Sequence, residues 1–497
     1  MNYVELDFSH IQKPDPTMDY RLVRGRIYDE RTAEKDFAVT IIVQAFDRLE
    51  KTRECIESIF CYTQGVNYKL LLLDNGSKSE DVTEYFKSVA YEFKTIIRIN
   101  KNITGCYALN AALHFVDTRY VAIVNNDIIV TANWLHNLLV CIESDASIGM
   151  VCPVSTHMSN RQEETLGGFD SLEEMQAKAR QFNISNPSLW EEKIRLIPSV
   201  VLYRMEILDT VGAYDTGFVH EFGDDDISYR LRENGYKLIL CRDTFVHHNH
   251  LPNERNTELE TIRFAAGRKS FLIKHYGLDA WTDMNNHLPD IGAFLPKIVY
   301  QKSFVDVLGV DVRCGNPLLE FSNQLRHYDR DVTCRFAGYT TQALYYHELC
   351  KITQHVTCGA ILDIEKREEQ YDVVVLGEAV NGYQQNVEDV LSRLIKVIRP
   401  GGWLICFASD FRLIENKCRM MAQESIAYWP YPVMSENEIR RILCMYHAQI
   451  KAEIPVTIQL GIRDKERKIL ESTCHVSLKE ALAEKVGETY YIIQLSE

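Results

Sequence analysis

Between residues 37 and 127, short apolar runs alternate with segments of helical spacing, and this alternation constrains the fold more than any other feature. The apolar runs are residues 37–46 (FAVTIIVQAF), 68–74 (YKLLLLD), 95–99 and 119–127 (RYVAIVNND). Their β-branched and apolar character is typical of strands that are covered on both faces. The segments with helical spacing are residues 48–60, 80–93 and 105–116. This order predicts an α/β fold with a doubly wound, mainly parallel sheet.

A second alternation of the same kind begins near residue 304. Its strand-like runs are FVDVLGVDV (304–312), YDVVVLG (371–377) and WLICFA (403–408), with a helical segment at 387–398. A helix and strands within 435–495 are expected to complete this second sheet. The length of 497 residues allows two to four domains at about 150 residues each, and the two alternations favour two. The predicted parts are an N-terminal extension (1–36), a first domain (37–276), a linker with two prolines (277–302) and a second domain (303–497).

The composition argues against several classes of protein. The formal net charge is −15, and nucleic-acid binding relies on basic side chains, so no nucleic-acid partner is expected. No apolar run approaches the about 20 residues that span a bilayer, so no transmembrane segment is expected. The 14 cysteines form no C-x-x-C pair, and the first residues lack the pattern of a secretory signal. We therefore expect a cytoplasmic protein with reduced thiols.

Three of the predicted strands end in residues that suit ligand binding, at the sheet edge where ligands usually bind in such folds. These ends are Phe46-Asp47, Asp74-Asn75 and Asn125-Asn126-Asp127. The carboxylates of Asp74 and Asp127 offer hard oxygen ligands, which suit Mg²⁺ or Mn²⁺ bridging the oxygens of a diphosphate. The alternative is a set of ordinary turns, because Asn and Asp favour turns at strand ends.

Three adjacent carboxylates, Asp224, Asp225 and Asp226, form the most acidic cluster of the first half. Carboxylates in contact repel one another and raise each other's pKa values, which suits a general base that works near neutral pH. The alternative is an acidic first turn of a helix over 226–234, which the helix dipole favours.

A run of imidazoles, His247-His248-Asn249-His250, follows the strand-like stretch KLILCRDTFV. Imidazole at a strand end suits a metal ligand that completes a site begun by Asp127. The alternative is an exposed His-rich turn without a ligand.

The order and spacing of these blocks, from Val39 to His248, resemble the family 2 glycosyltransferases, which have the GT-A fold. The matching blocks are Gln44–Arg48, Leu73–Ser77, Asn102–Gly105 with Asn110, Asn125–Asp127, Gly212–Asp215, and Gly223–Asp226 followed by Arg230 and Gly235-Tyr236. The stretch FGDDDISYR is also similar to the acidic block of the metazoan β-1,4-galactosyltransferases. Two positions depart from the family pattern. Asn125 stands where the family has the first Asp of D-x-D, and Gly223 stands where it has a Glu.

The resemblance implies an inverting transfer of a sugar from a nucleoside diphosphate sugar, with a UDP-sugar favoured by Asp74. It assigns Asp127 and His247 to the metal, with His248 as an alternative to His247. It assigns the general base to Asp224 or to its neighbour Asp225. The residues that it implies for the nucleotide sugar are Phe46, facing the base, Asp74, bonded to the base, and Asp47, Arg48, Asn75, Gly105, Asn110 and Asn126.

The second half resembles the class I S-adenosylmethionine-dependent methyltransferases. The loop L-D-x-G-C-G-x-G of that family corresponds to Val310–Pro317, and YDVVVLGEAVN and IRPGGWLICF match later blocks. Arg313 and Pro317 replace two glycines that let the backbone approach the cofactor, and Pro317 removes a backbone donor. The resemblance therefore implies a Rossmann-like methyltransferase fold that has lost its cofactor site, so S-adenosylmethionine is not expected to bind.

The leading hypothesis is a metal-dependent sugar transferase whose second domain serves packing, homodimer formation or acceptor binding. The expected partners are a nucleotide sugar and a glycan or protein acceptor. Two alternatives remain open: a bifunctional enzyme that also methylates the glycan, and a scaffold in which neither half is catalytic.

Overall fold

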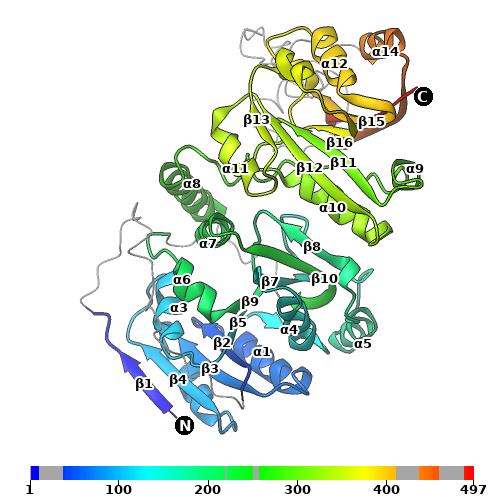
Figure 1. Cartoon of the computed structure of the whole chain (residues 1–497). Helices are drawn as coiled ribbons and strands as arrows, with labels where there is room; N and C mark the ends of the chain where they lie inside the picture. Colours follow the sequence, from blue (N-terminus) through cyan, green and yellow to red (C-terminus); the bar gives the residue numbers. More distant parts are fainter. Residues whose placement is uncertain are drawn as a thin grey trace, which may run out of the picture. The chain divides into compact units, whose positions relative to one another are not determined.

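The computed structural model describes residues 2–9, 37–218, 221–249, 257–409, 436–457 and 486–496. The chain divides into two compact units, Met1–Asn285 and Asn286–Glu497, and each surrounds its own sheet (Figure 1). The division lies within the segment 277–302, for which the sequence predicts a linker. Leu288, Ile291 and Leu295 of that segment are buried in a core of the second unit. Most of the predicted extension, residues 10–36, lies outside the described residues.

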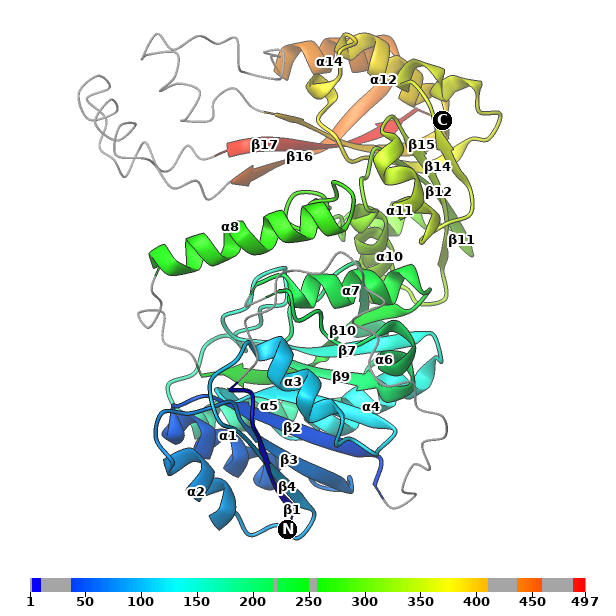
Figure 2. The same cartoon turned by 90° about the vertical axis from the view of Figure 1, so that its left-hand side faces the viewer.

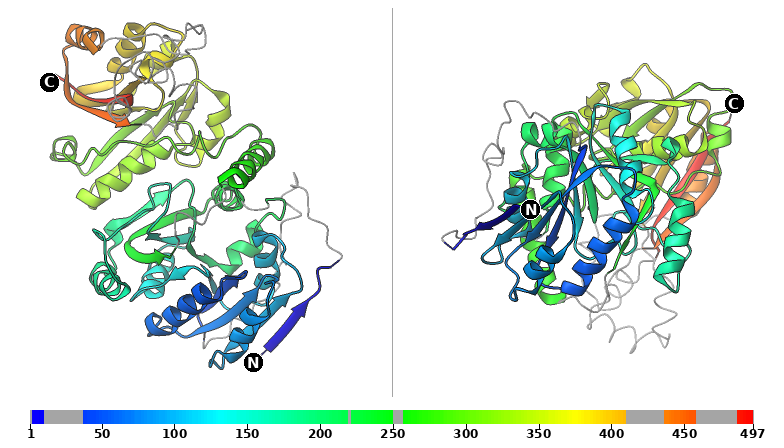
Figure 3. Two further views of the ribbon diagram at one scale, coloured as in Figure 1. Left: turned by 180° about the vertical axis from the view of Figure 1, so that it is seen from behind. Right: turned by 90° about the horizontal axis from the view of Figure 1, so that it is seen from below.

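The first unit contains a ten-stranded sheet in the order β1-β4-β3-β2-β5-β9-β7-β10-β6, with β8 beside β10. The strands are β1 (Asn2–Leu6), β2 (Val39–Ala45), β3 (Tyr68–Asp74), β4 (Lys94–Ile99), β5 (Tyr120–Asn125), β6 (Ile128–Ile129), β7 (Ile148–Ser155), β8 (Trp190–Lys193), β9 (Val200–Arg204) and β10 (Lys237–His248). Strands β2 to β5 are parallel to their neighbours, whereas β9 runs antiparallel to β5 and β7. The sheet is therefore mixed. Strand β1 forms an outer edge of this sheet and pairs in parallel with β4 (Figure 3).

Helices cover both faces of this sheet (Figure 2). On one face lie α1 (Leu49–Tyr62), α2 (Asp81–Ser88) and α4 (Trp134–Ser144), and on the other lie α3 (Gly105–Leu113), α6 (Met205–Val211) and α7 (Gly223–Glu233). Successive strand residues point to opposite faces, so Ile41 and Val43 pack with Ile56 of α1, while Ile42 packs with Ala108 of α3. The unit also contains α8 (Thr257–Lys274).

The polar segment 156–195 contains the helix α5 (Leu172–Phe182) and strand β8. The hydroxyl of Ser171 caps α5 by accepting a hydrogen bond from the Glu174 backbone amide. Only Met175 and Ala179 of this helix are buried. A polar helix with so narrow an apolar stripe is difficult to distinguish from a loop in the sequence.

The loops after β2 and β3 are joined to each other, which fixes this edge of the sheet. Asp47 and Arg48 adopt left-handed backbone conformations, with φ of 53° and 54°. The Asp47 amide donates to the Ser77 hydroxyl at 2.9 Å, and the Lys78 amide donates to the Asp47 carboxylate at 2.9 Å. Gly76 is required here because a Cβ atom would lie 2.1 Å from the Lys101 carbonyl carbon.

The second unit contains a seven-stranded sheet in the order β13-β12-β11-β14-β15-β17-β16. The strands are β11 (Phe304–Val310), β12 (Thr333–Thr340), β13 (Val356–Cys358), β14 (Tyr371–Leu376), β15 (Ile398–Ser409), β16 (Ala448–Thr457) and β17 (Val486–Leu495). The first five strands of this unit are parallel, and β17 runs antiparallel to both β15 and β16. Numbered along the unit, the strand order is 3-2-1-4-5-7-6.

Helices also lie on both faces of the second sheet. The apolar residues of α9 (Leu295–Ile298) and α10 (Asn316–Tyr328) share one core, and those of α12 (Val387–Lys396) and α14 (Glu436–Met445) share the other. A short helix, α11 (Tyr346–Cys350), follows β12. Within the described parts of both units, none of the helices has the length and apolar character needed to cross a membrane.

Candidate functional site

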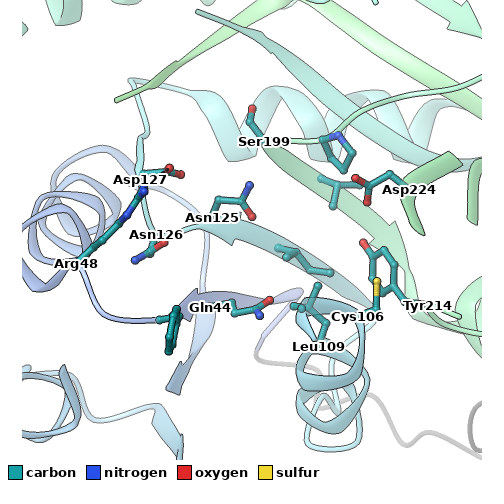
Figure 4. Close-up of a pocket in the computed structure, with 15 residues that line it drawn as sticks. Gln44, Arg48, Cys106, Leu109, Asn125, Asn126, Asp127, Ser199, Tyr214 and Asp224 are labelled. Atoms are coloured by element: carbon teal, nitrogen blue, oxygen red, sulfur yellow. Dashed lines mark ion pairs between the residues drawn. The ribbon is translucent and has the colours of Figure 1, made fainter. Parts of the chain in front are cut away.

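A pocket of about 460 Å³ opens at the carboxyl ends of β2 and β5 in the first unit (Figure 4). These two strands pair in register, so that Gln44 lies opposite Asn125 in the floor of the pocket. The lining residues are Gln44, Phe46, Arg48, Gly105, Cys106, Leu109, Ile123, Asn125, Asn126, Asp127, Pro198, Ser199, Val201, Tyr214 and Asp224. The pocket thus lies at the sheet edge where the sequence predicts a ligand site.

The charged groups lie at two separate ends of this pocket. Arg48 and Asp127 lie together at one end, while Cys106, Tyr214 and Asp224 lie at the other (Figure 4). A bound molecule therefore meets a cation-anion pair at one end and a carboxylate at the other.

At the first end, Asp127 is mostly buried between two nitrogen-containing side chains. Its Oδ2 atom lies 3.5 Å from Nε2 of His248 and 3.6 Å from Nη1 of Arg48. Burial alone would raise the pKa of Asp127, but the neighbouring His248 and Arg48 hold the pKa below its usual value. Asp127 is therefore a carboxylate at neutral pH.

The structure places His248, not His247, beside Asp127. His247 is buried, and its Nδ1 atom lies 2.9 Å from the Thr156 hydroxyl, while the Phe169 ring meets its imidazole edge-on. Burial, followed by the neighbouring His157 and His248, lowers the pKa of His247 to about 4. Successive side chains of a strand point to opposite sides, so the two adjacent histidines of β10 lie in different surroundings. His250 lies outside the described residues.

Asp127 and His248 could supply two ligands of a divalent-cation site. In the described part of the chain, no group of three or more His, Cys, Asp or Glu side chains is assembled to hold a metal. A carboxylate oxygen and an imidazole nitrogen that converge within 3.5 Å are nevertheless suitable ligands for Mn²⁺. A cation with two protein ligands keeps positions for water and for diphosphate oxygens, as is common for Mg²⁺ at phosphate sites.

At the second end, Asp224 faces the pocket with a raised proton affinity. Burial, followed by the charges of Asp225 and Glu221, raises its pKa from 3.8 to about 7, against the opposing charge of Arg195. A carboxylate of this kind is half ionised near neutral pH, which suits a general base.

The two carboxylates that follow Asp224 have different surroundings and do not line the pocket. The Oδ1 atom of Asp225 is buried 3.1 Å from Nη1 of Arg195. Asp226 is fully buried and lies within 2.9 Å of the side-chain nitrogens of Arg230, Lys274 and His275. Burial favours the neutral acid, but these basic groups hold the pKa of Asp226 far below its usual value. The predicted cluster is therefore one pocket carboxylate and two paired structural ones.

The predicted nucleotide residues divide into two groups. Those that line the pocket are Phe46, Arg48, Gly105 and Asn126, whereas Asp47, Asp74, Asn75 and Asn110 do not line it. Asp74 is fully buried, and it accepts hydrogen bonds from the Thr83 hydroxyl (2.5 Å), the Arg98 guanidinium (2.5 Å) and the Ser77 amide (2.9 Å). Asp74 therefore fixes the loop after β3, and Ser77 of that loop bonds to Asp47, which lies between the lining residues Phe46 and Arg48.

Asn75 and Asn110 also support the pocket rather than line it. The Asn75 side chain donates to the Ile103 carbonyl at 2.9 Å, which holds the loop before α3. The Asn110 amide group binds the Tyr214 backbone twice, accepting from its N–H at 3.0 Å and donating to its carbonyl at 2.6 Å. Asn110 therefore fixes the position from which Tyr214 enters the pocket.

Several lining residues were not among the predicted site residues. Gln44, Asn125 and Tyr214 lie in three of the blocks that resemble the family, Gln44–Arg48, Asn125–Asp127 and Gly212–Asp215, so the sequence held a signal for them. Cys106 and Ser199 had none, because they reach the pocket from segments far apart in the chain. The position of Cys106 also explains why residue 223 is a glycine, because a Cβ atom there would lie 2.8 Å from the Cys106 sulfur.

The match to a known family lies within this first unit. Residues 40–212 match the family model described as Glycosyl transferase family 2. The Uncharacterized protein y4gI of Sinorhizobium fredii (strain NBRC 101917 / NGR234) is 24% identical over 211 residues, which cover 40% of this chain and 23% of that protein. The matched region thus spans about a quarter of the length of that curated relative.

Two solved structures were also compared. One is GalNAc-T7 with UDP, GalNAc and Mn²⁺, at 12% identity and a TM-score of 0.36, covering 43% of this chain and 44% of that one. The other is the mannosyltransferase PcManGT from Pyrobaculum calidifontis in complex with GDP-Man and Mn²⁺, at 16% identity and a TM-score of 0.36, covering 50% of this chain and 66% of that one.

Proposed function

We propose, on the premise that residues 40–212 are a glycosyl transferase family 2 domain, that this chain is an inverting, divalent-metal-dependent sugar transferase of the cytoplasm. The family match confirms the prediction of a glycosyltransferase domain with a GT-A-like α/β fold. The donor is a nucleoside diphosphate sugar, and the acceptor is a hydroxyl of a glycan or protein. The observation that carries the proposal is one pocket with Asp127 and Arg48 at one end and Asp224 at the other, where His248 lies beside Asp127.

The two ends of the pocket suit the two halves of the reaction. Asp224 accepts the proton of the acceptor hydroxyl while the acceptor oxygen bonds to the anomeric carbon. The bond from that carbon to the diphosphate breaks, and the nucleoside diphosphate leaves. A single displacement from the opposite face inverts the anomeric configuration, and a carboxylate with a pKa of about 7 supplies the base at neutral pH.

The other end of the pocket suits the leaving diphosphate. Asp127 and His248 would hold a divalent cation, which when bound stabilises the negative charge that develops on the diphosphate. The Arg48 guanidinium, about two-fifths exposed, lies beside the same carboxylate and provides a fixed positive charge for phosphate oxygens.

Phe46 offers an aromatic face for the nucleotide base. Its side chain lines the pocket and is 39% exposed, so its ring is accessible to a bound base. Asp74 is held by Arg98 and Thr83, so it would influence the base indirectly, through the bond between Ser77 and Asp47 beside Phe46. UDP-sugars, which the family resemblance favours, are the first donors to test.

The decisive experiment is a panel of nucleotide sugars tested with and without Mn²⁺ by thermal shift and by release of the nucleoside diphosphate. We expect activity that Asp127→Ala and Asp224→Asn each abolish. The control is Asp117→Asn, which removes a half-exposed carboxylate that pairs with Lys69 away from this pocket. Full activity in either folded pocket variant contradicts the site assignment, and absence of binding to every donor favours the scaffold alternative.

We further propose that the second unit is a methyltransferase-like Rossmann domain that does not bind S-adenosylmethionine. Its first five strands follow the order 3-2-1-4-5 of doubly wound nucleotide-binding folds, which supports the fold. Both oxygens of Asp311, at the end of β11, are engaged by the Thr341 amide and hydroxyl and by the Tyr383 hydroxyl. Gly315 packs against Ile352 so closely that a Cβ atom would lie 2.1 Å from its Cδ1 atom.

These contacts favour a closed loop in place of a cofactor cradle. Calorimetry of the full chain with S-adenosylmethionine is expected to show no binding, and saturable binding would instead support the bifunctional alternative. The oligomeric state, measured by light scattering, tests the proposal that this unit forms a homodimer.

A further inference from the structure

We propose that Arg195 is a positioning residue that lowers the proton affinity of Asp224, because its guanidinium lies against the adjacent Asp225 and opposes the like charge of that carboxylate. The inference rests on the proposed function, in which Asp224 is the general base. Neither Arg195 nor Asp225 lines the pocket, so both would act through Asp224 rather than on the substrate.

Arg195 is fixed in place by contacts on two sides. The residue is 2% exposed, and its Nη1 atom lies 3.1 Å from the Asp225 carboxylate. The same nitrogen donates to the Ala280 carbonyl at 2.8 Å, and the Trp281 ring lies beneath the guanidinium at 5.8 Å. A buried cation held in this way keeps its distance from Asp225 and Asp224 as the pH changes.

The backbone around Arg195 joins the pocket wall to the helix that carries the base. The Leu196 amide donates to the Ser228 hydroxyl of α7 at 3.4 Å, and the Arg195 carbonyl accepts from the Asn160 side chain at 3.1 Å. Pro198 and Ser199, only three and four residues further on, line the pocket. The position of the cation is thus coupled to the geometry of the pocket.

The charged groups around Asp224 have opposite effects on its ionisation. Arg195 favours the ionised form of Asp224, whereas Asp225 and Glu221 favour the protonated form. The charge of Asp226 is paired with the basic groups Arg230, Lys274 and His275. Among the described residues, four further titratable groups interact with Asp224, and they are thiols and phenols whose pKa values burial raises: Cys106, Cys152, Tyr203 and Tyr214.

Substituting the two members of this pair should therefore have opposite effects. Arg195→Gln removes the positive charge, so Asp224 ionises at higher pH and the acidic limb of kcat/KM moves up by about one pH unit. Asp225→Asn removes the like charge, so the same limb moves down by a similar amount. A purely structural pair would lower activity in both variants without moving the limb in opposite directions, because both substitutions break the same contact.

The experiment is a pH profile of nucleoside diphosphate release for the wild type, Arg195→Gln and Asp225→Asn, with folding verified by thermal unfolding. Arg195→Lys keeps the positive charge, so the acidic limb of its pH profile is expected to lie closer to that of the wild type than the limb of Arg195→Gln does. Shifts in the same direction, or no shift in either variant, overturn the role of Arg195 while leaving the proposed function intact.

A second readout does not need activity. Because the pKa of Asp224 is raised above its ordinary value of 3.8, the stability that its protonation confers is lost as the pH rises through the folded-state pKa. For each protein, the unfolding temperature is compared with that of the same protein carrying Asp224→Asn. The difference between the two temperatures levels off at the pH that corresponds to the folded-state pKa of Asp224. We expect the levelling point to rise in Arg195→Gln and to fall in Asp225→Asn. If no donor is turned over by the wild type, the proposed function fails, and this measurement alone decides on Arg195.

Discussion

The Oδ2 atom of Asp127 lies 3.5 Å from the Nε2 atom of His248, at the end of the pocket that also contains Arg48. The preceding residue, His247, is directed to the Thr156 hydroxyl instead. Two adjacent histidines therefore separate into one that faces a carboxylate and one that supports the strand.

Replacing each of these histidines should distinguish metal binding from folding. We expect His248→Ala to weaken Mn²⁺-dependent donor binding by at least about tenfold, since an imidazole is lost beside the proposed metal ligand. His247→Ala should lower the free energy of unfolding by about 1–3 kcal/mol, because it removes a buried imidazole that bonds to the Thr156 hydroxyl and packs against the Phe169 ring. Calorimetry with Mn²⁺ and nucleotide, together with urea unfolding, separates the two effects. If His247→Ala reduces metal dependence more than His248→Ala does, the assignment is wrong.

The pH dependence of the wild type follows from Asp224. A base must be ionised to accept a proton, and the pKa of Asp224 is about 7, so kcat/KM should fall about tenfold for each pH unit below that value. Asp224→Asn should lower kcat by about 10²–10⁴-fold while the protein stays folded, because general base catalysis contributes about that much. Steady-state kinetics between pH 5 and pH 9 test both statements. An acidic limb near pH 4 would show that another carboxylate is the base.

The sequence was sufficient to predict the strands that are buried on both faces. The predicted run 68–74 coincides with β3, and 304–312 and 371–377 each contain an observed strand. Such strands consist almost wholly of apolar residues, so the pattern needs no knowledge of neighbours. The antiparallel direction of β9 was not predicted, because strand direction depends on how a connection returns to the sheet.

The candidate site was harder to predict at the level of single residues. Asp74 ends a strand as Asp127 does, yet Arg98 and Thr83, which are distant in sequence, enclose it completely. Three carboxylates that are adjacent in sequence have different surroundings. Asp224 faces the pocket, Asp225 faces one cation, and Asp226 faces three basic groups. Their pairing partners come from separate segments, so only the folded chain distinguishes the three carboxylates.

Removing the buried cation of Lys274 should strongly destabilise the first unit. The Lys274 ammonium lies 2.5 Å from Asp215 and 2.6 Å from Asp226, and all three residues are buried. Lys274→Met should lower the free energy of unfolding by about 3–5 kcal/mol, since it leaves two carboxylates without this partner. The matched control is Lys69→Met, which breaks a partly exposed pair with Asp117 and should cost less than about 1 kcal/mol. Equal losses in both variants, measured by urea unfolding, would contradict this interpretation.

The contact between Gly223 and Cys106 should be visible as a coupling between the two positions. Gly223→Ala places a methyl group 2.8 Å from the Cys106 sulfur, and we expect it to lower the free energy of unfolding by about 1–3 kcal/mol through overpacking. Cys106→Ala removes that sulfur, so the double variant should be more stable than the sum of the single changes predicts. A double-mutant cycle measured by denaturant unfolding tests this, and additive effects would show that the Gly223 backbone relaxes on its own. Because Gly223 precedes Asp224, activity that recovers only in the double variant would show that the glycine is retained to keep the base in place beside Cys106.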